Sequence, residues 1–170
     1  TCLVAPNSLH HVWLADWAAL YPEAAVFVAP GLEKKVPGAL AARARTLDDH
    51  PPAEWAEVID QAAVLGDILN EICFFHRPSR TLVLTDLIEN FEACRVCARW
   101  RWVVKLAGAA DPHGSAPHDM RASFARRRGP LRAAVQRMIG WSPERVILAH
   151  GRWYDRDGTR ELQRAFRWAL

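Results

Sequence analysis

The sequence has few of the features that mark a membrane, secreted or low-complexity protein. Its 170 residues contain no apolar run close to the ~20 residues that a membrane helix needs. No basic segment followed by an apolar stretch stands at the N-terminus, so no signal peptide is visible. We therefore expect a chain that does not span a membrane and is located in the cytoplasm.

Cysteine is scarce, with only Cys2, Cys73, Cys94 and Cys97. Four cysteines are too few for a disulfide framework in a domain of this size. Cys94 and Cys97 form one C-x-x-C pair, but a four-thiolate zinc site needs a second pair. Cys2 and Cys73 lie instead within apolar, strand-like runs. We interpret Cys94 and Cys97 as two helix-borne free thiols.

Lysine is also scarce, because 19 of the 22 basic residues are arginine. The net charge of +3 combines −5 in residues 1–120 with +8 in residues 121–170. The densest basic run is Arg126-Arg127-Arg128. Such a run can bind phosphate or nucleic acid, or can form a solvated helix face. No helix-turn-helix, zinc-finger or RNA-recognition signature accompanies it, which argues against nucleic acid as the partner.

Strand-like and helix-like segments alternate along the chain and predict a single α/β domain over residues 1–170. A hydrophobic fraction of 51% and eight tryptophans favour a large apolar core or an interface. Asn7 or Ser8 can cap the first helix, in which Trp13, Trp17, Leu20 and Tyr21 share one face. Strands are predicted at 2–5, 25–29, 59–65, 71–75, 80–85 and 145–149, and helices before Pro22, over 87–98, 118–128 and 130–139, and from Thr159.

Polar side chains with ligand atoms follow three of the predicted strands. His10 and His11 come after the first strand, and Asp86 follows the strand ending at Thr85. His150 follows the strand ending at Ala149 and precedes Gly151. If these strands share a sheet and a direction, the side chains converge at one edge. Two imidazoles and one carboxylate suit Zn, Fe or Mn and leave positions for water. A bound cation would lower the pKa of that water and make hydroxide available near neutral pH.

Each of these residues has a simpler interpretation. Asp86 can cap a helix that starts near Leu87, and His150 can be a turn histidine. His10 and His11 would point about 100° apart on a helix, so both cannot easily bind one ion. The other histidines are expected elsewhere: His50 in a surface loop, His76 in a hydrogen-bonded turn, and His113 and His118 in a loop over 107–118.

These stretches resemble the metallo-β-lactamase-like superfamily, and most closely an uncharacterised bacterial family with that fold. The matching segments are 3–11, 75–86 and 146–151, and with the helices between them they cover nearly the whole chain. The resemblance implies a four-layer αββα sandwich. It also implies strands before the metal-binding loop, so we expect this domain to lack its N-terminal strands.

The superfamily motif His-x-His-x-Asp-His is only partly present. Aligned on its last histidine, this chain has Pro6, Ser8, His10 and His11 at the four ligand positions. The resemblance therefore implies that the first metal site is lost, and that His11, Asp86 and His150 would hold a second metal ion. His10 replaces the aspartate, where it would serve as a fourth ligand or as a catalytic proton carrier.

Three hypotheses follow from these residues. The first is a metal-dependent hydrolase of an ester, thioester or phosphoester, with one divalent ion (Zn, Fe or Mn), although a metal-free protein is an equal alternative. The second is a non-catalytic member of the fold that binds a small molecule or a partner, including another copy of itself. The third is a nucleic-acid-associated protein that uses the Arg-rich C-terminal third.

Overall fold

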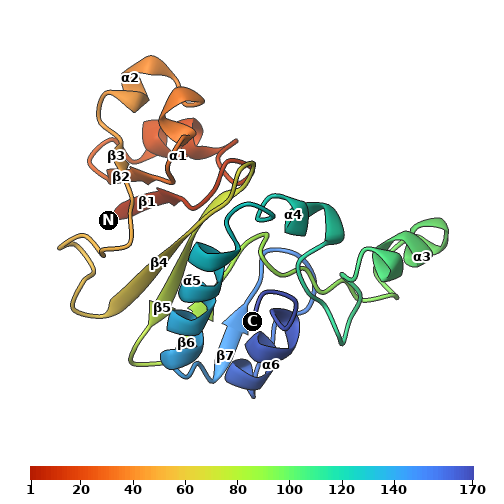
Figure 1. The fold of residues 1–170 in the computed structure, drawn as a ribbon. Helices are drawn as coiled ribbons and strands as arrows, with labels where there is room; N and C mark the ends of the chain where they lie inside the picture. Colours follow the sequence, from red (N-terminus) through yellow and green to blue (C-terminus); the bar gives the residue numbers. More distant parts are fainter.

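The computed structural model describes residues 1–170 and shows two β-sheets with helices on their outer faces (Figure 1). In the first sheet all strands are parallel, and in the second only the last pair is parallel. The first sheet consists of β1 (Cys2–Ala5), β2 (Ala25–Val28) and β3 (Arg45–Thr46), in that order. The second consists of β4 (Ile59–Leu65), β5 (Asn70–His76), β6 (Thr81–Val83) and β7 (Arg145–Ile147).

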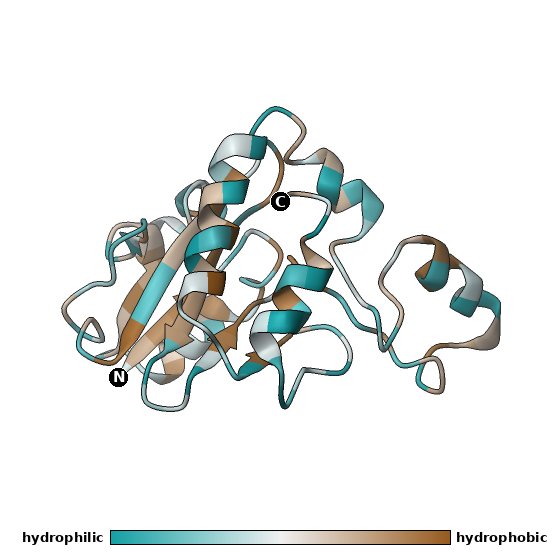
Figure 2. Cartoon of the chain, turned by 60° about the horizontal axis from the view of Figure 1, so that its bottom comes forward, coloured by the Kyte–Doolittle hydropathy of each residue, from teal (hydrophilic) through white to brown (hydrophobic).

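Helices lie on the outer face of each sheet. Those on the first sheet are α1 (Leu14–Leu20) and α2 (Gly38–Ala41), with the 3-10 turn η1 (Leu32–Lys34) between them. Those on the second sheet are α5 (Arg128–Gly140) and α6 (Gly158–Ala165). Two others, α3 (Ala98–Leu106) and α4 (His118–Ala122), lie beside this sandwich, and α3 projects away from it (Figures 1 and 2). No helix has the length and hydropathy needed to cross a bilayer.

Three apolar clusters fill the spaces between the layers. In β2, Val26 and Val28 face the helices α1 and α2, whereas Phe27 between them faces the second sheet. In β5, Ile72 meets Phe27 between the sheets, and its neighbour Cys73 belongs to the cluster under α5 and α6. This alternation is the period-two geometry of a strand that is buried on both faces. The predicted α/β architecture with αββα layers is confirmed.

The predicted helix over 87–98 is wrong, because residues 89–91 pair with other segments and a turn follows at 93–95. Glu89, Asn90 and Phe91 each form an isolated β-bridge with a segment distant in sequence. Leu87 and Ile88, just before these bridges, are both buried in the main apolar cluster. Tertiary pairing therefore overrides the local helical spacing. As a result, Cys94 and Cys97 are exposed free thiols that precede α3.

The first helix begins at Leu14, later than predicted, and presents an unexpected face to the sheet. Its buried residues are Leu14 and Ala18, whereas Trp13 and Trp17 are exposed. The small Ala18 side chain lies between the helix and β1–β2, so the aromatic stripe remains on the surface. Five of the eight tryptophans are exposed, namely Trp13, Trp17, Trp100, Trp102 and Trp153. Core packing therefore does not explain them.

Leu82→Ala tests the position of the main core. Leu82 lies in β6 and is 0% exposed, so its truncation should lower the free energy of unfolding by about 2–5 kcal/mol. The matched control is Leu106→Ala on α3, where the side chain is 66% exposed and the change should be below about 0.5 kcal/mol. Urea unfolding measures both values. Equal losses in the two variants would contradict the assigned core.

Candidate metal centre

Three ligand-type side chains from distant parts of the sequence meet at one point. The Nε2 atom of His10 lies 3.3 Å from Asp86 Oδ1 and 3.2 Å from His150 Nε2. The remaining pair, His150 Nε2 and Asp86 Oδ1, is separated by 2.9 Å. Of all His, Cys, Asp and Glu side chains, these three form the group that could hold a metal ion.

The strand ends position these residues. Asp86 and His150 follow β6 and β7, which are parallel neighbours, so their carboxyl ends meet at one edge of the second sheet. His10 lies in the turn that follows β1, and β1 is a strand of the first sheet. The two sheets meet at this edge through the bridge between Asn7 and Glu71. The site therefore lies where both sheets end.

Asn7 links the turn that carries His10 to Asp86. Its Oδ1 atom accepts hydrogen bonds from the backbone N–H groups of Leu9 and His10, both at 2.8 Å. Its Nδ2 atom donates to Asp86 Oδ2 at 2.5 Å and to Thr85 Oγ1 at 2.6 Å. Asn7 thus fixes the carboxylate through Oδ2 and leaves Oδ1 facing the two imidazoles. The sequence predicts Asn7 as a possible helix cap, and it caps the turn before α1.

Glu71 supports the same site from beneath. Its carboxylate is fully buried and accepts hydrogen bonds from the backbone N–H groups of Thr85 at 2.7 Å and Asp86 at 2.8 Å. Burial raises the pKa of Glu71, although these two hydrogen bonds act in the opposite direction. Burial also raises the pKa of Glu89, three residues beyond Asp86. Glu71 therefore holds in place the backbone that carries Asp86.

The site has a buried floor and an open rim. The side chain of Asp86 is 2% exposed, whereas those of His10 and His150 are 33% and 38% exposed. The imidazole rings of His10 and His150 lie 5.2 Å apart between centroids. Beside His10, a groove of about 350 Å³ runs along β1 and α1. Small molecules can therefore approach from the histidine side.

His11 does not join the cluster, although the predicted ligand set contains it. The structure brings His10 to Asp86 and His150 in its place. His11 lines the groove, and its Nδ1 atom is buried without a hydrogen-bond partner. The Asn7 bonds to the turn explain the choice, because they aim His10 toward Asp86 and adjacent side chains diverge. His10 occupies the position at which the superfamily motif has its aspartate.

The remaining histidines lie outside the cluster. His76 Nδ1 is 2.7 Å from Ser79 Oγ, as predicted for a hydrogen-bonded turn. His50 is exposed in a loop, also as predicted. His113 and His118 line a separate pocket together with arginines.

Sequence reasoning missed Glu71, and it assigned Asn7 a capping role alone. A signal for Glu71 is present, because this carboxylate opens the apolar run Ile72 to Phe75. A charged residue within a strand buried on both faces must be compensated by hydrogen bonds or by opposite charge. No local pattern identifies its partners, since Thr85 and Asp86 come from the next strand end.

Solved structures supply the comparison for this fold. No protein-family model and no curated protein matches the chain. It is similar to the metallo-β-lactamase DIM-1, in a crystal exposed to ceftazidime, at 10% identity and a TM-score of 0.55. That alignment covers 98% of this chain and 67% of the other. The chain has the metallo-β-lactamase fold. A superfamily protein from the archaeon Sulfolobus tokodaii is similar at 13% identity and a TM-score of 0.54, over 97% of this chain and 66% of that one.

The donor set fits a divalent cation in this metallo-β-lactamase fold. Ligand atoms about 2.0–2.2 Å from a zinc ion lie roughly 2.9 Å apart at a right angle and roughly 3.4 Å apart at the tetrahedral angle. The three measured separations of 2.9, 3.2 and 3.3 Å fall within this range. Two imidazole nitrogens with one carboxylate oxygen also suit Fe or Mn.

Asn7→Ala tests how the site is held. The substitution removes the partner of Asp86 Oδ2 and the acceptor for two backbone N–H groups. We expect a loss of about 1–3 kcal/mol in the free energy of unfolding, measured by urea titration. The neighbouring Ser8→Ala, at a partly exposed position, is the control and should change stability little. Wild-type stability in Asn7→Ala would contradict the role assigned to Asn7.

Proposed function

We propose that this protein is a metal-dependent hydrolase of an ester or thioester, with His10, Asp86 and His150 holding one divalent cation. The observation that carries the proposal is the convergence of the two Nε2 atoms and Asp86 Oδ1 within 3.3 Å of one another. Zn, Fe and Mn all suit these ligands. A bound cation of this kind supplies Lewis-acid chemistry and an activated water.

The residues around the ligands have distinct roles in this proposal. Asn7 orients Asp86 by its bond to Oδ2, and Glu71 fixes the Asp86 backbone. Outer contacts of this type keep ligands in place and tune their basicity. His10 and His150 form the exposed rim, so the substrate enters from their side. His11 lies next to this rim and lines the groove.

The groove beside His10 favours a substrate with an apolar acyl group. Its lining includes no arginine, lysine or carboxylate. A phosphoester would bring negative charge into a groove with no arginine or lysine, so the lining favours an ester or thioester instead. The apolar lining residues are Leu3, Val4, Ala5, Leu9, Val12, Trp13, Leu14 and Trp17.

Zinc binding by single variants tests the ligand set. His10→Ala, Asp86→Ala and His150→Ala should each weaken zinc binding by more than the roughly 10- to 100-fold that loss of an outer-shell partner costs. His11→Ala should retain zinc, and so should His50→Ala, the control in an exposed loop. Calorimetry and metal analysis give the affinity and the stoichiometry. Loss of zinc from His11→Ala but not from His10→Ala would instead favour the set His11, Asp86 and His150.

Chain-length preference tests the substrate class. The zinc-loaded protein should cleave p-nitrophenyl hexanoate with a higher kcat/KM than p-nitrophenyl acetate, because the longer chain buries more apolar surface in the groove. Trp17→Ala should reduce this preference by about tenfold. Trp102→Ala on the projecting helix α3 is the matched control and should leave it unchanged. Zinc-dependent activity with no chain-length preference would contradict the role of the groove.

A non-catalytic binding protein is the second candidate, and the exposed groove favours it as well. Trp13 and Trp17 leave an apolar surface beside the metal centre that a ligand or partner would cover. Zinc binding without hydrolysis of either ester would support this candidate.

We further propose that the protein belongs to the uncharacterised bacterial family that its sequence resembles. We also propose a cytoplasmic location, which the four free cysteines support.

A further inference from the structure

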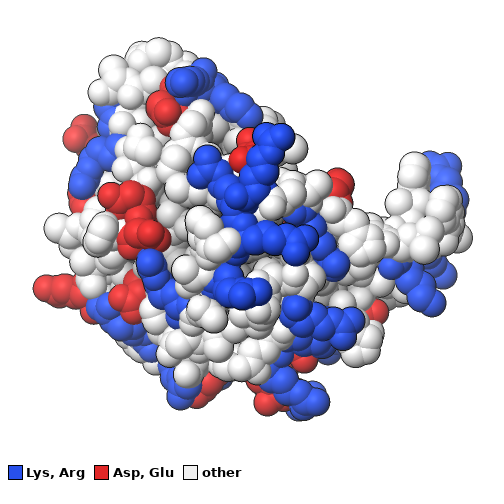
Figure 3. Space-filling view, in the orientation of Figure 1, with Lys and Arg blue, Asp and Glu red and all other residues white.

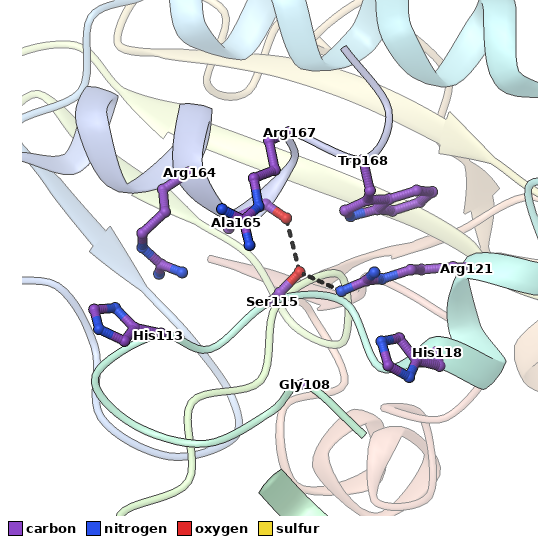
Figure 4. A pocket seen from close by; sticks show the side chains of 9 residues that line it. All are labelled: Gly108, His113, Ser115, His118, Arg121, Arg164, Ala165, Arg167 and Trp168. Carbon is purple, nitrogen blue, oxygen red and sulfur yellow. Dashed lines mark hydrogen bonds between the residues drawn. The ribbon is translucent and has the colours of Figure 1, made fainter. Parts of the chain in front are cut away.

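A second cavity, of about 450 Å³, lies between the loop before α4 and the C-terminal end of α6 (Figure 4). Neither the three candidate ligands nor any residue of the apolar groove lines it. Its volume falls within the usual range of small-molecule sites, about 300–1,000 Å³. The lining residues are Gly108, His113, Ser115, His118, Arg121, Arg164, Ala165, Arg167 and Trp168.

The lining contains three arginines and two histidines but no carboxylate. Arg121 bonds only to neutral oxygens, with Nε donating to Ala116 O at 2.9 Å and a terminal nitrogen donating to Ser115 Oγ at 3.0 Å. The guanidinium of Arg167 has no hydrogen bond or ion pair within the chain. Burial and the nearby charge of Arg167 lower the pKa of Arg121. The lining therefore presents two positive charges, one of them on the solvent-exposed Arg167, and no carboxylate beside them.

Arg164 is the third arginine, and its charge is already matched. Its Nε atom donates to Glu161 at 2.7 Å, and a terminal nitrogen donates to the Tyr154 hydroxyl and to Gly114 O, both at 3.0 Å. Burial raises the pKa of Tyr154 to about 12, so the hydroxyl stays neutral at physiological pH. Arg164 thus forms a fixed wall, and the unmatched charge belongs to Arg121 and Arg167.

Trp168 forms part of the cavity wall beside Arg121. Its indole Nε1 is buried without a hydrogen-bond partner, so this atom does not face the cavity. The Arg121 guanidinium lies 5.2 Å from the centre of the same ring. Gly108 lies opposite with φ +77°, and a Cβ there would be 3.4 Å from the Arg121 guanidinium. Glycine therefore keeps the space beside Arg121 open.

We propose that this pocket binds a small molecule through a phosphate monoester group. Such a group carries about −1.5 to −2 charges at neutral pH, which matches two unneutralised arginines. The forked guanidinium pairs bidentately with phosphate oxygens. The cavity exceeds what one phosphate fills, so an organic portion occupies the rest. The proposal is independent of the proposed hydrolase activity.

Three arginines of the arginine-rich C-terminal third, Arg121, Arg164 and Arg167, line the proposed phosphate pocket. Figure 3 shows Lys and Arg side chains spread over the face that carries α4, α5 and α6. Most of these charges belong to a solvated surface. The run Arg126-Arg127-Arg128, which stands out in the sequence, does not line the pocket, and Arg127 pairs with Asp67 at 3.3 Å.

Calorimetric titration of the full chain in phosphate-free buffer tests the proposal, with phenyl phosphate, inorganic phosphate and benzoate as probes. We expect saturable binding of both phosphates, with phenyl phosphate the tighter, and weaker binding of the singly charged benzoate. Arg167→Gln should raise the Kd for phenyl phosphate by about tenfold or more, which corresponds to the loss of one charge-assisted hydrogen bond. Arg167 makes no side-chain bond within the chain, so this variant should fold normally.

Two controls separate this pocket from other sites. Arg160→Gln makes the same charge change on α6 outside the pocket and should alter the Kd by less than about twofold in physiological salt. His150→Ala should bind phenyl phosphate normally, since His150 belongs to the metal centre. The proposal is overturned if the parent chain binds neither phosphate, if benzoate binds as tightly as phenyl phosphate, if Arg160→Gln weakens binding as much as Arg167→Gln, or if His150→Ala abolishes binding.

Discussion

The buried amide of Asn7 is the contact on which the candidate metal centre depends. It lies at the end of the first sheet, and its Nδ2 atom bonds Asp86, which follows the second sheet. Its Oδ1 atom fixes the turn that aims His10 toward the same point. A single side chain thereby sets the spacing between His10 and Asp86, which are 76 residues apart in sequence. Glu71 completes this support by holding the Asp86 backbone N–H.

This support has an energetic consequence for the fold. Asn7, Glu71 and Asp86 are all buried, and burial of uncompensated polar groups opposes folding. Their mutual hydrogen bonds offset that cost only when both sheets are in their final positions. The polar contact thus acts together with the apolar cluster around Phe27 and Ile72 to fix how the sheets stack. The same geometry leaves the two imidazoles at the rim, open to solvent.

The molecule carries two concave sites of opposite character. The groove beside His10 is apolar and lacks fixed cations, whereas the pocket beside α6 is lined by arginines and lacks carboxylates. The first site offers mainly apolar side chains to a ligand, and the second offers guanidinium groups. The extended segment after Asp86 connects them, because Glu89 N donates to Ser115 O at 3.2 Å. The two proposals therefore concern sites with separate linings.

The sequence determined the layered α/β fold and the strand ends that carry Asp86 and His150, because strand periodicity and the polar residues after each strand are local features. Only the tertiary structure shows that His10, and not His11, lies beside Asp86 and His150, since adjacent side chains diverge. It also replaced the expected helix over 87–98 with bridged residues and a turn, and left Trp13 and Trp17 exposed. These outcomes depend on partners distant in sequence, and helical spacing carries no information about them.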